Sequence, residues 1–157
     1  MKMAPVVAAV WMATVGLGAS GGPSVDVATR AKGSGRVVIA TVTDVQPRYD
    51  VNEHGDRIIV SQTYLAIEES LKGAPAQLLP VDIEGGTIGD VTLSVSDMPK
   101  LKRGDRAVFF LDARVTSAGA HRLHGRGLGV LKLDDSNHVA GTRVTLQDVK
   151  AAIQAGR

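Results

Sequence analysis

Cysteine is absent from the 157-residue chain. Disulfide bonds, zinc–thiolate centres and cysteine nucleophiles all need a thiol group, so the sequence excludes each of them. Attachment of a lipid to cysteine is excluded for the same reason. The stability of the fold must therefore come from packing and hydrogen bonding.

Aromatic residues and excess charge are also scarce. The chain has one Trp, two Tyr and two Phe, and its formal net charge is only +2. Such a chain generates no long-range field that would attract nucleic acid or an anionic membrane. Hydrophobic residues still make up 44% of the sequence, with valine abundant among them. Because β-branched residues favour strands, this composition predicts a β-rich globular domain.

The amino-terminal segment has the features of a secretory signal peptide. Lys2 precedes a mostly apolar stretch over residues 4–17, and small residues follow at 18–20. A retained membrane anchor or a buried helix is the alternative, although a spanning helix needs about 20 apolar residues. We therefore predict a signal peptide over residues 1–20 and a secreted or periplasmic protein, with no stable membrane span after processing.

The next segment, residues 21–35, is rich in small and polar residues. This composition predicts a flexible tether that includes, at most, one helical turn around residues 27–31. A single β domain then follows over residues 36–157.

Strand patterns recur along this domain. The expected strands cover residues 37–45, 57–67, 81–84, 91–96, 107–111, 121–124 and 128–133. The first two are expected to pair as a hairpin through the polar connection 48–56. Ala107–Leu111 is an unbroken apolar run that contains both phenylalanines, Phe109 and Phe110. Such a run is typical of a central strand covered on both faces.

The chain is expected to end in a helix over residues 145–155. Thr145 and Asp148 have the spacing of a capping box. Leu146, Val149 and Ile153 then form an apolar stripe. This helix is expected to cover an open end or edge of the sheet.

Three motifs occur in a recognisable order along residues 36–153. They are Leu71-Lys72-Gly73, Gly85-Gly86, and the run from Pro99 through Gly104, Asp105, Phe109 and Phe110 to Leu111. With the terminal helix, this order resembles a family of small exported, mostly uncharacterised bacterial proteins. Their domain is similar to the OB-like barrel of netrin and tissue-inhibitor-of-metalloproteinase modules.

The resemblance implies a mainly β fold, a small antiparallel OB-like β-barrel of about six or seven strands with a carboxyl-terminal α-helix. An open two-sheet sandwich is the alternative. The metalloproteinase inhibitors place an amino-terminal cysteine on the catalytic zinc, and this chain has no cysteine to do so. The resemblance implies no catalytic residue.

The connection 48–56 contains a partial calcium-loop pattern. Asp50, Asn52 and Asp56 supply oxygen donors at alternating positions around a glycine. Ser61, however, stands where such a loop requires a bidentate Glu. A polar hairpin loop is the alternative, and the sequence favours it.

Two histidines near the glycine-rich segment are the other candidates for ligand binding. His121 and His124 are three residues apart, which on a strand places them on opposite faces and disfavours a shared metal ion. We predict solvated surface histidines there, with no metal site and no cofactor.

No catalytic constellation is recognisable, so the sequence favours an exported, non-enzymatic binding or interaction module. Its partner is expected to be a protein or an envelope polymer, and nucleic acid is not expected. The resemblance alone suggests an inhibitor-like role toward an exported protease. The alternative is a small-ligand or metal-binding protein, or an unrecognised hydrolase, that uses the loops 48–56 and 121–129.

Overall fold

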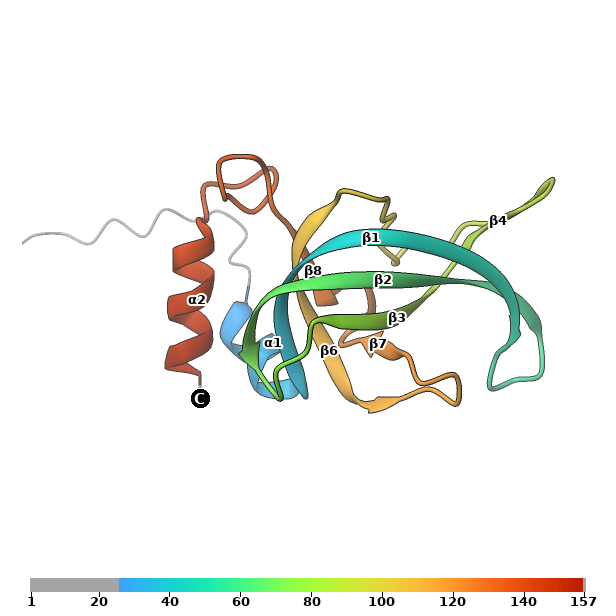
Figure 1. The fold of residues 1–157 in the computed structure, drawn as a ribbon, viewed down its shortest axis with the longest axis horizontal. Coiled ribbons are helices and arrows are strands. Elements are labelled where there is room, and N and C mark those ends of the chain that lie inside the picture. Colours follow the sequence, from blue (N-terminus) through green and yellow to red (C-terminus); the bar gives the residue numbers. More distant parts are fainter. Residues whose placement is uncertain (1–25, 157) are drawn as a thin grey trace, which may run out of the picture.

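The computed structural model describes residues 26–156 of the chain. The predicted signal peptide, residues 1–20, and residues 21–25 of the predicted tether lie outside this range. The described part is mainly β with a carboxyl-terminal helix, as expected (Figure 1). The elements are α1 (Val27–Gly33), β1 (Arg36–Val51), β2 (Arg57–Lys72), β3 (Leu78–Glu84), β4 (Gly86–Ile88), β5 (Val91–Leu93), β6 (Arg106–Val115), β7 (His121–Leu123), the 3-10 turn η1 (Arg126–Gly129), β8 (Val130–Lys132) and α2 (Leu146–Ala155). Within residues 26–156 no helix is long and apolar enough to cross a membrane.

Six of the strands form one curved sheet. Their order is β1-β2-β3-β7-β6-β8, and β1 also pairs with β6. The predicted hairpin of β1 and β2 is confirmed, with antiparallel pairing that extends to Val51 opposite Arg57. The β3–β7 pair is parallel and the other pairs are antiparallel. Strands β4 and β5 form a separate hairpin that projects from the end of the sheet opposite the helices (Figure 1).

The central strand has both faces covered, as predicted from its apolar run. Every residue from Ala107 to Leu111 is fully buried, and β6 pairs with β1, β7 and β8. Val108 and Phe110 point into a core that the two helices cover, here called the helix-side core. Ala107, Phe109 and Leu111 point to the other face, into the inner core within the curved sheet. Burying each phenylalanine contributes about 2–3 kcal/mol.

Part of the predicted tether is a packed helix. Asp26 accepts a hydrogen bond from the amide of Thr29 (3.0 Å) and thereby caps α1. Val27 and Ala31, one helical turn apart, are buried in the helix-side core, to which α2 contributes Val149 and Ile153. The expected helical turn is therefore present. The prediction of a flexible tether is wrong for residues 27–33, because packing against α2 stabilises a helix that would be too short to form alone.

The Leu71-Lys72-Gly73 motif holds α1 in place. The ammonium group of Lys72 donates hydrogen bonds to the carbonyl oxygens of Ala31 (2.7 Å), Lys32 (3.3 Å) and Ser34 (2.6 Å). These carbonyls lie at the carboxyl end of α1, where they have no backbone partner within the helix and carry partial negative charge. The Ser34 hydroxyl also donates to the Ala31 carbonyl (3.1 Å). Lys72 therefore links the end of β2 to a helix that lies about forty residues earlier in the chain.

The turn before β6 depends on Gly104 and Asp105. Gly104 has a positive φ of 90° and its amide donates to the carbonyl of Val42 (2.8 Å). The Asp105 carboxylate accepts from the Lys102 amide (3.0 Å) and from the Lys132 ammonium group (2.9 Å). Burial acts to raise the pKa of Asp105, but the hydrogen bonds from Lys132 and Lys102 outweigh it and lower that pKa.

Helix α2 begins as predicted, while several strand ends differ. Thr145 and Asp148 form the reciprocal capping box. Strand β6 continues to Val115, beyond the strand expected over residues 107–111, and residues 126–129 form η1 before the short strand β8. Asp82 on β3 is only 8% exposed, because side chains from neighbouring segments cover it.

We expect Lys72→Met to lower the free energy of unfolding by about 1–3 kcal/mol, because the part-buried carbonyls of Ala31 and Ser34 and the exposed carbonyl of Lys32 lose a charged donor. Chemical denaturation of the purified domain measures this change. Lys32→Met is the matched control, because Lys32 is exposed on α1 and its loss should cost less than about 0.5 kcal/mol. Equal losses in the two variants would contradict the capping role.

Candidate functional site

The β1–β2–β3 ribbon separates two cavities, because side chains alternate between its faces. One is a charged cleft of about 570 Å³ on the outer face. The other is an apolar cavity of about 320 Å³ on the inner face. The pairing of β1 with β2 is irregular between Val42 and Asp44, and this irregularity shifts the alternation of side chains along β1. Beyond it, Val45 and Pro47 face inward, while Arg48 and Asp50 face outward.

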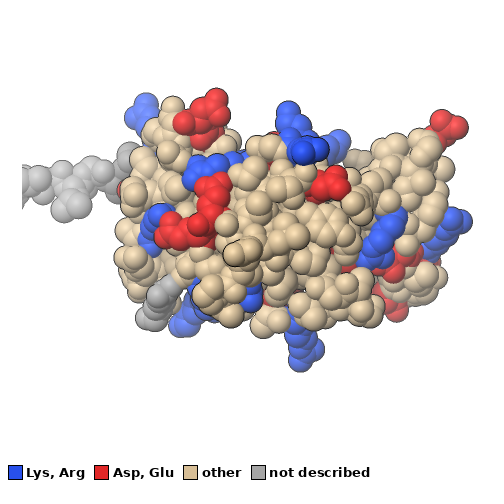
Figure 2. All heavy atoms as spheres, in the orientation of Figure 1, with Lys and Arg blue, Asp and Glu red and all other residues tan. Residues whose placement is uncertain are grey.

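The charged cleft joins the two loop regions that the sequence singled out. Its walls come from the outward face of the ribbon, from the end of the β1–β2 hairpin and from residues 112–126. Its charged lining residues are Arg48, Asp50, Glu53, Asp82, Glu84, Asp112, Arg122 and Arg126. Over the face shown in Figure 2, acidic and basic side chains are interleaved without a large area of one sign.

Arg48 organises the floor of the charged cleft. Its guanidinium group contacts the carboxylates of Asp50 (2.5 Å) and Asp82 (2.9 Å). The buried Asp82 carboxylate also accepts from Thr116 (3.3 Å) and Gln62 (3.4 Å), so its charge is compensated. Strand β1, strand β3 and the segment after β6 therefore meet at one carboxylate.

The pKa of Asp50 is lowered by three groups. The backbone amide of Val51 has the largest effect and donates to the Asp50 carboxylate (2.8 Å), and the hydrogen bond from Arg48 adds to it. Arg122 contributes a further electrostatic effect. The ionised carboxylate is thus held in place at the cleft wall.

The predicted oxygen donors of the 48–56 connection are used within the hairpin. The Asn52 side-chain oxygen accepts hydrogen bonds from the backbone amides of His54 (2.9 Å) and Asp56 (2.8 Å). The backbone amide of Asn52 donates to the backbone carbonyl of Asp56 (3.0 Å). Asp50 and Asn52 line the cleft, whereas Asp56 contacts Asn52 through a 3.2 Å hydrogen bond. This arrangement matches the polar hairpin loop that the sequence favoured.

His121 and His124 both contact Asp112, although opposite faces were expected. The prediction of solvated surface histidines is wrong for His121, which is buried, while His124 is half-buried. His121 Nδ1 lies 3.1 Å from the carbonyl oxygen of Asp112, and His124 Nδ1 lies 2.8 Å from the Asp112 carboxylate. Strand β7 ends at Leu123, so the alternation that led to the expectation no longer applies at His124. Within residues 26–156 no cluster of three or more His, Asp or Glu side chains is arranged to hold a metal ion.

Arg126 closes the side of the cleft nearest η1, which the sequence analysis did not anticipate. Its guanidinium group hydrogen-bonds Asp97 and also contacts Glu84 (3.2 Å). These hydrogen bonds raise the pKa of Arg126, and the bond from Arg126 lowers the pKa of Asp97. No local pattern marks this interaction, because its partners lie 29 and 42 residues away in the chain.

Two charged side chains of the cleft are available to a partner. Among the described residues, Arg122 forms no hydrogen bond or ion pair through its side chain, and it is exposed. The Glu53 side chain is 85% exposed at the hairpin end. The lining as a whole has five carboxylates and three guanidinium groups, so it carries a net negative charge.

Comparisons with known proteins identify no family for this chain. No protein-family model matches it, and no curated protein gives a significant match. The resemblance described from the sequence motifs therefore stays a prediction.

We expect Arg48→Gln to raise the pKa of Asp50 toward its ordinary value, measured by NMR titration of the carboxyl carbons. The rise should be partial, because the Val51 amide remains. A lowered pKa stabilises the fold above the unfolded-state pKa, and that contribution is lost as the pH falls through the folded-state pKa. The variant should therefore lose more stability at neutral pH than at pH values below both the folded-state and the unfolded-state pKa of Asp50.

Arg57→Gln is the control on the same hairpin. Arg57 stacks 3.7 Å above the Tyr49 ring centroid and contacts no carboxylate among the described residues. The Asp50 pKa should be unchanged in this variant. An unchanged Asp50 pKa in Arg48→Gln would contradict the role assigned to Arg48.

Proposed function

We propose that this chain is an exported, non-enzymatic binding module with an OB-like barrel, and that the charged cleft is its binding site. One observation carries the proposal. Residues 52–54 of the hairpin end and residues of the segment 116–126, distant in sequence, line the same cleft. Two loops that are far apart in the sequence therefore form one surface.

The strand order supports the OB-like barrel. Pairing runs from β1 through β2, β3, β7 and β6, and β6 pairs again with β1. OB folds bind ligands over the second and third strands, between the loop that joins strands one and two and the loop that joins strands four and five. In this five-strand circuit the corresponding connections are residues 52–56 and 116–120. Residues of both connections line the charged cleft.

The charge of the cleft favours a protein partner with basic side chains. Carboxylates outnumber guanidinium groups in the lining, and Arg48 and Arg126 are already paired with acidic residues. Nucleic acid is disfavoured, because each phosphate would meet this negative field. An extended, basic segment of another exported protein fits the site best. Protease inhibition is one form of such binding.

The Asp112–His124 contact supports binding over hydrolysis. A carboxylate that holds one histidine nitrogen is the arrangement that orients a general base toward a nucleophile. Here the other nitrogen, Nε2, faces the backbone at Gly33, where an added Cβ would lie only 2.5 Å away. Helix α1 thus occupies the place that a nucleophile would need.

We expect Glu53→Lys to reduce capture of a basic protein partner at least several-fold, because it reverses an exposed charge at the cleft. The measurement is quantitative mass spectrometry of proteins retained from the exported fraction by the immobilised domain. Asp90→Lys is the matched control, since Asp90 is also an exposed acid at a hairpin turn but lies outside the cleft. Arg122→Glu should strengthen the same capture.

These variants also define the contradicting outcomes. Equal losses in Glu53→Lys and Asp90→Lys would show that the cleft is not the site. Weaker capture by Arg122→Glu would show that the partner is not basic.

Export is tested separately by fractionation of cells that produce the full chain. We expect the protein outside the cytoplasm, with an amino terminus near residue 20. Val10→Asp, within the apolar stretch, should retain the uncleaved chain in the cytosol. A wild-type protein that remains in the cytosol and begins at Met1 would contradict the assignment.

A further inference from the structure

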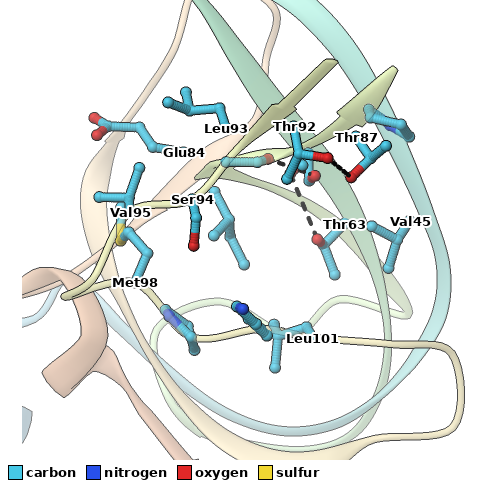
Figure 3. Close-up of a pocket in the computed structure, with 17 residues that line it drawn as sticks. Val45, Thr63, Glu84, Thr87, Thr92, Leu93, Ser94, Val95, Met98 and Leu101 are labelled. Atoms are coloured by element: carbon cyan, nitrogen blue, oxygen red, sulfur yellow. Dashed lines mark hydrogen bonds between the residues drawn. The ribbon is translucent and has the colours of Figure 1, made fainter. Parts of the chain in front are cut away.

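The apolar cavity on the inner face of the ribbon is a second site (Figure 3). It lies across the ribbon from the charged cleft, and the two share only Glu84 and Met98 among the residues that line them. Strands β1, β2 and β3 supply one wall. The β4–β5 hairpin and the segment before β6 supply the other walls. Its apolar lining residues include Val45, Ile83, Leu93, Val95, Met98 and Leu101.

The cavity is continuous with the inner core. Ile83 belongs to the inner core, and Val45, Met98 and Leu101 pack against that core. A molecule in the cavity would therefore contact side chains that the fold already keeps from water. Mouths of small β-barrels and pockets of this size are common places for small-molecule sites.

The walls of the cavity are formed in advance. Gly86, with a positive φ of 142°, brings the hairpin so close to β2 that an added Cβ would lie 2.5 Å from the Ser61 hydroxyl. The Gly85 amide donates to the Ile59 carbonyl (2.8 Å), and the Ser61 hydroxyl donates to the Gly85 carbonyl (2.7 Å). These contacts fix the base of the hairpin, so binding needs little rearrangement.

A buried hydroxyl in the cavity lacks a good partner. Thr63 is only 1% exposed, and its hydroxyl lies 3.5 Å from the Ser61 carbonyl, at the limit of a hydrogen bond. Among the described residues no group donates to the Thr63 hydroxyl. The Ser94 hydroxyl, which forms no hydrogen bond within residues 26–156, points into the cavity from the opposite wall (Figure 3).

We propose that this cavity binds a small neutral molecule that has an apolar body and one hydroxyl group. The body would contact Val45, Met98 and Leu101, and the hydroxyl would both donate and accept between Thr63 and Ser94. Two charged residues, Glu84 and Lys100, line the cavity. A neutral ligand is favoured because the charge of Glu84 is paired with Arg126, its carboxylate points away from the cavity (Figure 3), and the exposed charge of Lys100 is screened by water. This inference is independent of the partner proposed for the charged cleft.

The experiment is an NMR titration of the labelled domain with 1-octanol, and with octanoate as the charged comparison. We expect 1-octanol to cause saturable shifts at backbone amides that surround the cavity, with octanoate binding more weakly. Thr63→Val, which keeps the shape but removes the hydroxyl, should weaken 1-octanol binding about fivefold to tenfold. Thr43→Val is the matched control, because the Thr43 hydroxyl donates to the Tyr64 carbonyl outside the cavity.

Ser94→Trp tests the location without disturbing the core. Ser94 is exposed, and an indole ring at this position would fill the cavity, so 1-octanol binding should be lost. Unchanged binding in Ser94→Trp, or no saturable shift in the wild type, would overturn the site. Equal affinity of Thr63→Val and the wild type for 1-octanol would overturn the role of the ligand hydroxyl. Tighter binding of octanoate than of 1-octanol, abolished by Lys100→Gln, would overturn the neutral ligand.

Discussion

The fold depends on one constraint, which is that the segment Ala107–Leu111 must be removed from water on both faces. A strand with one apolar face needs a single covering layer, but this strand needs two. The curved sheet supplies one layer, and helices α1 and α2 supply the other. Adjacent phenylalanines, Phe109 and Phe110, are divided between the two cores because successive side chains on a strand point in opposite directions. Both candidate sites lie on the ribbon that curves away from this strand.

Features that depend on neighbouring residues could be predicted from the sequence. The capping box of Thr145 and Asp148, the β1–β2 hairpin and the central strand all follow from local spacing. The docking of α1 could not be predicted, because its stability comes from α2 and from Lys72, both distant in sequence. The composition of residues 21–35 indicated a tether, since small polar residues are weak evidence for a helix until a partner surface exists.

The candidate site was predictable as a set of loops but not as a geometry. The connection 48–56 was identified from its oxygen donors, yet its part in the cleft depends on Arg48, whose partner Asp82 lies on another strand. The convergence of His121 and His124 on Asp112 was likewise missed, because β7 ends one residue before His124. Strand periodicity describes side-chain direction only while the strand continues. The apolar cavity had no local signal at all.

The two sites use opposite faces of the same three strands, so both depend on the residue spacing of the ribbon. Ser61 and Thr63 face the apolar cavity, while Ile58 and Val60 face the charged cleft. Adding or deleting one residue of β2 between these positions would turn each side chain beyond it to the reverse face. A residue inserted before Ser61 would turn the Ser61 and Thr63 hydroxyls into the charged cleft and the polar Gln62 side chain toward the apolar cavity. Insertions here should therefore be rejected during evolution, while point substitutions on either face can accumulate independently, allowing one specificity to diverge as the other is preserved.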